Sequence, residues 1–119
     1  MDDGSDPDRL AAELRPILER VAREGGTITY RDLAASARVP GPHSIHKTTM
    51  ALESLIRADH AAGRALIAAV AVGKPGRPRP GFFHVLHELG RYHGPESGAD
   101  ADAHHDDELA GVYATYRTA

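Results

Sequence analysis

The sequence predicts a mainly α-helical protein with a small β-sheet, an α+β fold class. Three observations lead to this prediction. The length of 119 residues and the hydrophobic fraction of 41% suit one domain with a modest core. Apolar residues recur at helical spacing in several stretches that Gly and Pro separate. Two stretches, "TITY" at 27–30 and "ALIAAVAV" at 65–72, have the composition of short strands.

The first predicted helix begins near Asp6, which can cap it. Pro7 suits its first position, because a proline lacks the N–H that stays unpaired there. The apolar face of this helix consists of Leu10, Leu14, Ile17, Leu18 and Val21. Pro16 is expected to kink or split the helix near Arg15, and the glycine pair at 25–26 is expected to end it.

A short strand, a short helix and a turn are expected next. "TITY" is β-branched and aromatic, which favours a strand, and "RDLAASA" at 31–37 favours a short helix. Pro40, Gly41 and Pro42 then exclude regular structure.

Ser44 is the expected N-cap of the following helix, which extends to about Ala62 and ends at Gly63. Its apolar stripe consists of Ile45, Leu52, Leu55 and Ile56. The continuous apolar run at 65–72 is most simply a buried strand, and "TITY" is its expected partner.

The basic stretch "GKPGRPRPGFF" at 73–83 leads into a predicted short helix, with a return strand from Gly81 as the alternative. Residues 94–103 have the composition of a flexible linker. Residues 104–119 are expected to form a C-terminal helix that docks on the protein's own core or forms a homodimer. Its apolar stripe consists of Leu109, Val112, Tyr113 and Tyr116.

The predicted elements follow the order of a winged-helix-turn-helix: helix, short strand, helix, turn, helix, strand and basic loop. Residues 1–93 are therefore predicted to form a winged-helix-like domain. The helix from Ser44 takes the place of the recognition helix, and the stretch at 73–83 takes the place of the wing.

Two stretches, "ITYRDLAASARVP" and "ALIAAVAVGKPGRPRPGF", resemble in layout the DNA-binding domain of alkyltransferases and alkyltransferase-like proteins. The residues that carry this resemblance are Ile28, Tyr30, Leu33 and Ala34. The resemblance covers roughly residues 25–83 and implies a winged-helix shape and DNA binding. It does not imply alkyl transfer, because residues 70–73 read Val-Ala-Val-Gly where that family has Pro-Cys-His-Arg or its Trp-substituted version, and the chain has no Cys or Trp.

The net charge of −3 is unevenly distributed along the chain. Residues 27–93 hold nine Lys and Arg against four Asp and Glu, whereas residues 1–26 and 94–119 have balances of −3 and −5. A basic middle segment can bind a polyanion, because binding responds to the local field. The alternative is that the acidic ends only balance a basic domain.

The candidate nucleic-acid contacts lie on the predicted recognition helix and on the basic stretch. They are His43, Ser44, His46, Lys47, Thr48, Arg57, Lys74, Arg77 and Arg79. A helix N-terminus and cations on a proline-stiffened loop both suit phosphate. The helix start has no Arg, Asn or Gln to read base edges, so the expected DNA binding has weak sequence specificity. The alternative is an ordinary solvated surface.

Other classes of function find less support. The absence of Cys excludes a disulfide framework, a thiolate metal site and a cysteine nucleophile. His84, His87, His104 and His105 could hold a metal only if the tail folded back, so no metal and no cofactor are predicted. The sequence has no nucleophile elbow, so no catalytic residue is predicted. It also has no signal peptide and no apolar run of ~20 residues, so a cytoplasmic protein without a membrane partner is expected.

The sequence thus predicts a small winged-helix-type protein that binds nucleic acid, most simply DNA, or acts as a regulator, without catalytic activity. The alternative is a protein–protein interaction module whose basic loop meets an acidic partner. A His-based metal-binding protein is the third possibility.

Overall fold

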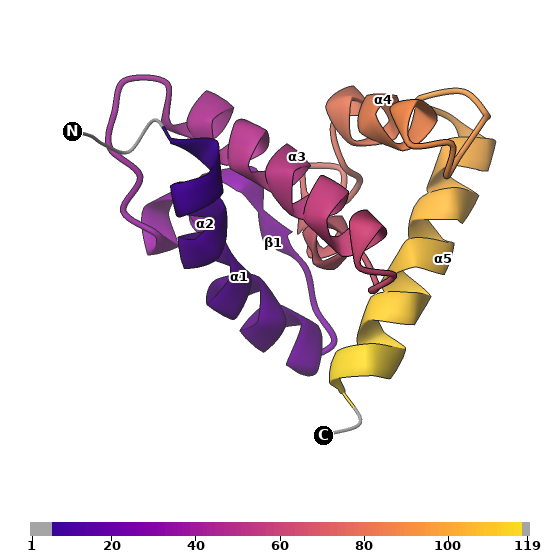
Figure 1. The fold of residues 1–119 in the computed structure, drawn as a ribbon, viewed down its shortest axis with the longest axis horizontal. Helices are drawn as coiled ribbons and strands as arrows, with labels where there is room; N and C mark the ends of the chain where they lie inside the picture. Colours follow the sequence, from indigo (N-terminus) through magenta and orange to yellow (C-terminus); the bar gives the residue numbers. More distant parts are fainter. Residues whose placement is uncertain (1–5, 118–119) are drawn as a thin grey trace.

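The computed structural model describes residues 6–117, which form five α-helices, one 3₁₀ helix and a two-stranded sheet. The elements are α1 (Pro7–Arg23), β1 (Ile28–Thr29), α2 (Tyr30–Ser36), α3 (Ser44–Ala61), η1 (Ile67–Val70), β2 (Ala71–Val72), α4 (Pro80–Glu88) and α5 (Ala99–Tyr116). The protein is therefore mainly helical with a small sheet, which confirms the predicted α+β class. In Figure 1, α1 to α3 form one side of the molecule, and α4 and α5 close the other.

Helix α1 begins as its sequence predicts. The Asp6 carboxylate accepts hydrogen bonds from the N–H groups of Asp8 and Arg9, and Pro7 is the first helical residue. The helix ends at Arg23, and Gly25 beyond it adopts a φ of +72°, a conformation that glycine tolerates best.

The expectation that Pro16 splits this helix is wrong, because α1 continues through it. A proline inside a helix deprives the carbonyl four residues earlier of its partner. Here that residue is Ala12, and both Ala12 and Pro16 are exposed, so water can hydrogen-bond to the carbonyl. The opposite face of α1 keeps Leu10, Leu14 and Leu18 buried.

The two strands pair in parallel, which confirms the predicted partnership of "TITY" with the apolar run. The register pairs Ile28 with Ala71 and Thr29 with Val72. The prediction of a strand over the whole of 65–72 is wrong, because η1 occupies most of this run and β2 has only two residues. Residues 66–72 are all buried. An apolar run buried on every side has no periodicity that separates a strand from a helix.

Helix α3 begins at the predicted residue but with a different cap. Ser44 is the first helical residue and not the N-cap; His43 holds that position with a φ of +64° and makes no capping hydrogen bond. The turn at 40–43 ends with His43 in the left-handed backbone conformation, and Ser44 is the first residue with helical dihedral angles. The helix ends at Ala61, followed by Gly63 with a φ of +71°.

The segment after β2 is a turn that leads directly into helix α4. The short helix predicted within "FFHVLHELGRY" at 82–92 is confirmed, although α4 begins at Pro80, and the alternative of a return strand from Gly81 is wrong. Phe82, Phe83, Val85 and Leu86 of α4 are buried.

Helix α5 begins at Ala99, so the prediction of a linker that lasts to residue 103 is wrong at its end. Asp100 and Asp102 lie in the first turn, where acidic side chains stabilise a helix N-terminus. Ala101 is buried there, which docks the new turn on the core. The acidic and small residues that give this stretch a linker-like composition are the same residues that form the first turn of α5.

The core lies between α1 and α3, and α5 covers η1 and α1 from the side. Its largest fully buried apolar side chains are Leu14, Leu18, Leu33, Ile56, Leu66, Ile67 and Leu86. The apolar stripe of α5 packs on this core within the same chain, with Val112 fully buried and Leu109, Tyr113 and Tyr116 partly buried. Among the described residues, no helix combines the length and the apolar character that crossing a membrane requires.

Candidate functional site

A groove made of two adjoining hollows runs along α2 and the first turn of α3, and one of the hollows reaches the loop at 73–79. Its two parts have volumes of about 390 Å³ and about 400 Å³ and share Arg31 and Ile45. We call it the basic groove, and its lining residues are Thr29, Tyr30, Arg31, Asp32, Ala34, Ala35, Arg38, Val39, Ser44, Ile45, Val72, Gly73, Lys74 and Arg79. Four of these residues are cationic, and Asp32 is the only carboxylate among them.

Ion pairs neutralise four of the nine Lys and Arg residues in the segment 27–93. Arg57 pairs with Glu88, Arg64 with Asp59, Arg77 with Asp106 and Arg91 with Glu108, at N–O distances of 2.6, 3.0, 2.7 and 2.8 Å. The other five are Arg31, Arg38, Lys47, Lys74 and Arg79, and none of them forms an ion pair with a residue in the described range 6–117.

Four of these five cations lie along the basic groove. Arg31, Arg38, Lys74 and Arg79 are exposed and line the basic groove. Lys47 lies in the first turns of α3, where its ammonium donates a hydrogen bond to the Pro40 carbonyl at 3.0 Å. The groove therefore has a positive local field although the whole chain is acidic.

The loop at 73–79 presents Lys74 at its tip. The Gly73 N–H donates to the Arg77 carbonyl at 2.8 Å, and the Gly76 N–H donates to the Gly73 carbonyl at 3.0 Å. Gly76 has a φ of +85°, which lets the chain reverse within these few residues. Pro78 is buried and fixes the base of the loop. The tip is therefore a closed turn with one exposed ammonium group.

Tyr30, the first residue of α2, holds Arg79 at the edge of the groove. The Arg79 backbone N–H donates to the Tyr30 hydroxyl at 2.7 Å, and the guanidinium carbon lies 5.3 Å from the centre of the ring. Burial raises the pKa of the Tyr30 hydroxyl above its ordinary value, against the opposite effect of the Arg79 N–H and charge. The hydroxyl is therefore neutral at physiological pH, and the ring face attracts the cation.

The N-terminus of α3 opens onto the same groove through Ser44 and Ile45. The first N–H groups of a helix have no partner inside the helix, and α3 has no side-chain cap to accept from them. The exposed side chains of His43 and His46 flank this end. Uncapped N–H groups and a positive dipole end add to the attraction for an anion.

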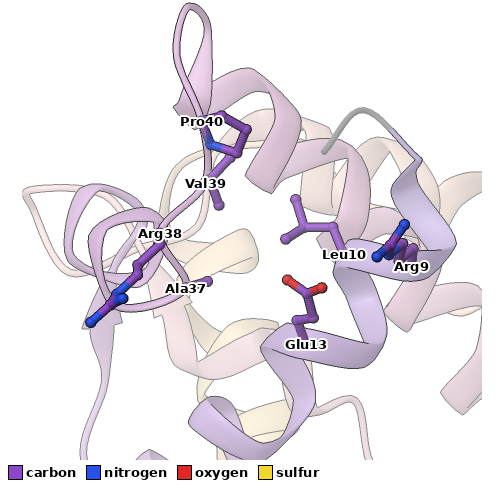
Figure 2. Close-up of a pocket in the computed structure, with 7 residues that line it drawn as sticks. All are labelled: Arg9, Leu10, Glu13, Ala37, Arg38, Val39 and Pro40. Carbon is purple, nitrogen blue, oxygen red and sulfur yellow. The ribbon is translucent and has the colours of Figure 1, made fainter. Parts of the chain in front are cut away.

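A further hollow of about 180 Å³ adjoins the basic groove, since Arg38 and Val39 line both. Figure 2 shows Leu10 and Glu13 of α1 reaching toward Val39, whereas the side chains of Arg9 and Arg38 point away from the gap. Carbon atoms and one carboxylate therefore face this hollow. Because the positive charge lies in the basic groove, the groove is the candidate site.

The structure brings together some of the sequence-predicted contacts and separates others. Lys74, Arg79, His43 and His46 are exposed at or beside the groove, with Ser44 and Lys47 partly buried next to them. Thr48 is fully buried, and its hydroxyl donates to the Ser44 carbonyl at 2.8 Å. Thr48 therefore lies beneath the surface and supports the helix start.

Two predicted arginines lie in ion pairs away from the groove. Arg57 donates to Glu88 of α4, and Arg77 turns toward α5. Two cations that the sequence reading did not single out, Arg31 and Arg38, line the groove instead. Their place in the basic segment 27–93 is the signal that the sequence offers for both residues.

The histidines do not form a metal site in the part of the chain that the structure describes. No group of three or more His, Asp or Glu side chains there is arranged to hold a metal ion. His87 hydrogen-bonds to the Gly94 carbonyl at 2.6 Å, His104 to Glu108 at 2.9 Å and His105 to the Ala69 carbonyl at 2.8 Å. These three rings therefore have protein partners.

The chain was compared with protein-family models, with curated proteins and with solved structures. None of the three comparisons finds a match to it.

Proposed function

We propose that the protein binds the phosphate backbone of duplex DNA in the basic groove. The observation that supports the proposal is the separation of charge: four cations of the basic segment are paired, and four of the other five line one groove. Phosphate contacts from Lys and Arg supply most of the affinity of sequence-independent DNA binding, through release of counterions.

In this proposal α2 and α3 act as a helix-turn-helix pair, and the loop at 73–79 takes the place of the wing. The loop joins β2 to helix α4, where a winged helix has a returning strand. The layout resemblance of residues 25–83 to the DNA-binding domain of alkyltransferase-like proteins supports the same arrangement. The missing cysteine motif leaves alkyl transfer out of the proposal.

The proposed binding has weak sequence specificity. Bidentate readout of bases uses Arg, Asn or Gln, and the chain contains no Asn and no Gln. The exposed residues at the start of α3 are His46 and Met50, with Lys47 partly buried. Contacts that position the protein on the backbone therefore dominate over contacts that read bases, which suits an accessory or regulatory protein without catalytic activity.

The surface favours a polyanion over a protein partner. Met50, 41% exposed, is the only large apolar side chain that is exposed among the described residues. Protein-binding surfaces usually have a contiguous apolar centre, and a single methionine does not provide one. The basic groove therefore supports a polyanion as the proposed ligand.

The proposal is tested by the affinity of a labelled mixed-sequence duplex for three proteins, measured by fluorescence anisotropy. These are the wild type, a groove variant with Arg31→Ala, Lys74→Ala and Arg79→Ala, and a control variant with Arg20→Ala, Arg23→Ala and Arg57→Ala. Both variants lose three positive charges, so their net charges are equal. We expect the groove variant alone to lose binding; equal losses in both variants, or no binding by the wild type, would overturn the proposal.

A further inference from the structure

Arg77 lies on the basic loop, but its side chain points away from the groove and into a set of acceptors on α5. Its Nη1 atom lies 3.1 Å from the Asp102 carbonyl oxygen, 3.0 Å from His105 Nδ1 and 2.7 Å from Asp106 Oδ1. Its Nε atom lies 3.5 Å from Asp102 Oδ1. One guanidinium therefore connects the loop to Asp102, His105 and Asp106, three residues on one face of α5.

His105 is the buried member of this set. Its side chain is fully buried, and its Nε2 atom lies 2.8 Å from the Ala69 carbonyl oxygen of η1. A carbonyl only accepts, so Nε2 bears the hydrogen, and Nδ1 is free to accept from Arg77. The neutral ring thus joins the loop, α5 and η1 in one hydrogen-bonded chain.

The backbone of Arg77 completes the loop, since its carbonyl accepts from the Gly73 N–H at 2.8 Å. Two residues later, Arg79 is fixed on Tyr30 at the other side of the loop. Lys74 lies at the tip of the loop, three residues before Arg77. The loop that presents Lys74 and Arg79 is therefore attached at two points, to α5 through the Arg77 side chain and to Tyr30 through the Arg79 N–H.

We propose that Arg77 is a positioning residue that ties the basic loop to α5 and does not itself contact phosphate. This inference rests on the proposed function of the groove, and it gives α5 a role in that function. The acidic C-terminal helix sets the geometry of the phosphate-facing loop through Asp102, His105 and Asp106. The guanidinium presents two nitrogen atoms in one fixed plane to these acceptors, Nη1 and Nε, whereas an ammonium group presents a single nitrogen atom.

The first test uses the free protein and measures amide exchange at Gly73, Gly76 and Arg79, the loop residues whose N–H groups are hydrogen-bonded. We expect Arg77→Ala and Arg77→Lys each to accelerate this exchange about tenfold, the scale of one lost charge-assisted hydrogen bond. Lys74→Ala, on the same loop with the same loss of charge as Arg77→Ala, is expected to leave it unchanged. Wild-type exchange rates in Arg77→Lys would overturn the proposal.

A second variant distinguishes a local change in the loop from a general loss of the fold. Asp106 is exposed, so Asp106→Ala removes one acceptor of Arg77 without opening the core. We expect faster exchange in the loop and unchanged exchange at the core amides of α1 and α3. Exchange that is unchanged in the loop, or that rises equally in loop and core, would contradict a local positioning role.

The salt dependence of DNA binding distinguishes a residue that positions the loop from a residue that contacts phosphate. Each phosphate contact contributes about −0.9 to the slope of log K against log salt. We expect Lys74→Ala to make the slope less steep by about 0.9 and Arg77→Ala to weaken binding with the slope unchanged. An equal change of slope in Arg77→Ala would show that Arg77 contacts phosphate. If the wild type binds no duplex, the proposed function fails, and the exchange results still decide whether Arg77 fixes the loop.

Discussion

Arg79 lies with its guanidinium carbon 5.3 Å from the centre of the Tyr30 ring, and its backbone N–H donates to the Tyr30 hydroxyl at 2.7 Å. Arg79 directly precedes α4, and Tyr30 is the first residue of α2. The two residues are 49 positions apart in the chain. Their contact places the basic loop beside Arg31 and thereby forms one wall of the basic groove.

Tyr30→Phe is predicted to weaken duplex binding several-fold, because the ring remains but the Arg79 N–H loses its acceptor. The loss of one neutral hydrogen bond lowers the free energy of unfolding by about 1 kcal/mol. Tyr113→Phe is the matched control, since the Tyr113 hydroxyl also makes one hydrogen bond to the backbone, in which it donates to the Gly26 carbonyl at 2.8 Å. Denaturant unfolding should show similar losses for both variants, and anisotropy should show weaker binding for Tyr30→Phe only.

Arg31→Ala and Arg57→Ala are predicted to differ in their effect on duplex affinity, because only Arg31 lines the basic groove, whereas Arg57 is a contact that the sequence alone predicts. Arg31 lines the basic groove, whereas Arg57 donates to Glu88 at 2.6 Å. We expect Arg31→Ala to reduce duplex affinity and Arg57→Ala to leave it near the wild-type value. A larger loss of duplex affinity for Arg57→Ala in the same anisotropy titration would contradict this prediction and would indicate that DNA contacts α3 at Arg57.

Asp59→Ala is predicted to destabilise the fold strongly. The Asp59 side chain is fully buried, and it accepts from Arg15 at 2.7 Å, from Arg64 at 3.0 Å and from the Ile67 N–H at 3.1 Å. The substitution removes these hydrogen bonds to a charged group, each of which contributes about 1.5–3 kcal/mol, together a large share of the stability of a small domain. Urea unfolding measures this loss, and Glu88→Ala, at an exposed pair with Arg57, should change stability little.

The stability of the protein is predicted to fall in mildly acidic solution through His105. Burial lowers the pKa of His105 below its ordinary value of 6.5, and the Arg77 charge acts in the same direction, whereas the hydrogen bond to Ala69 and the charges of Asp106 and Asp102 oppose the shift. Phe82 of α4, which meets the ring edge-on, adds no charge.

As the pH falls below 6.5, the unfolded chain takes up a proton at this histidine while the folded protein does not. The free energy of unfolding therefore decreases until the pH reaches the lowered pKa, and it is unaffected by this group at higher pH. His105→Gln retains an N–H donor for Ala69 and does not titrate. Thermal unfolding across this range should show a steeper acid loss in the wild type than in His105→Gln, and parallel curves would contradict the prediction.

The ends of the helices could be predicted where a residue has one clear structural role, such as capping a helix or ending it. Asp6 and Pro7 specify the start of α1, and the glycines at 25–26 and 63 specify helix ends. The run at 65–72 could not be assigned in the same way, because burial on all sides removes the periodicity that distinguishes η1 from a strand.

The candidate site could be predicted only in part, since it depends on which cations are paired. The sequence shows that residues 27–93 are basic, but it does not show that Arg57 meets Glu88 or that Arg77 meets Asp106. The second of these pairs joins residues 29 positions apart across a turn, a helix and a loop. Arg31 and Arg38 become candidates only once these partners are known.

The most direct test of the account is the salt dependence of duplex binding by the wild type and by the variant with Arg31→Ala, Lys74→Ala and Arg79→Ala. We predict that log K falls linearly with log salt for the wild type. The slope of the variant should be less steep by about 2.7, which corresponds to three lost phosphate contacts at about 0.9 each. Binding that does not depend on salt, or equal slopes for the two proteins, would contradict the assignment of the basic groove as a phosphate-binding surface.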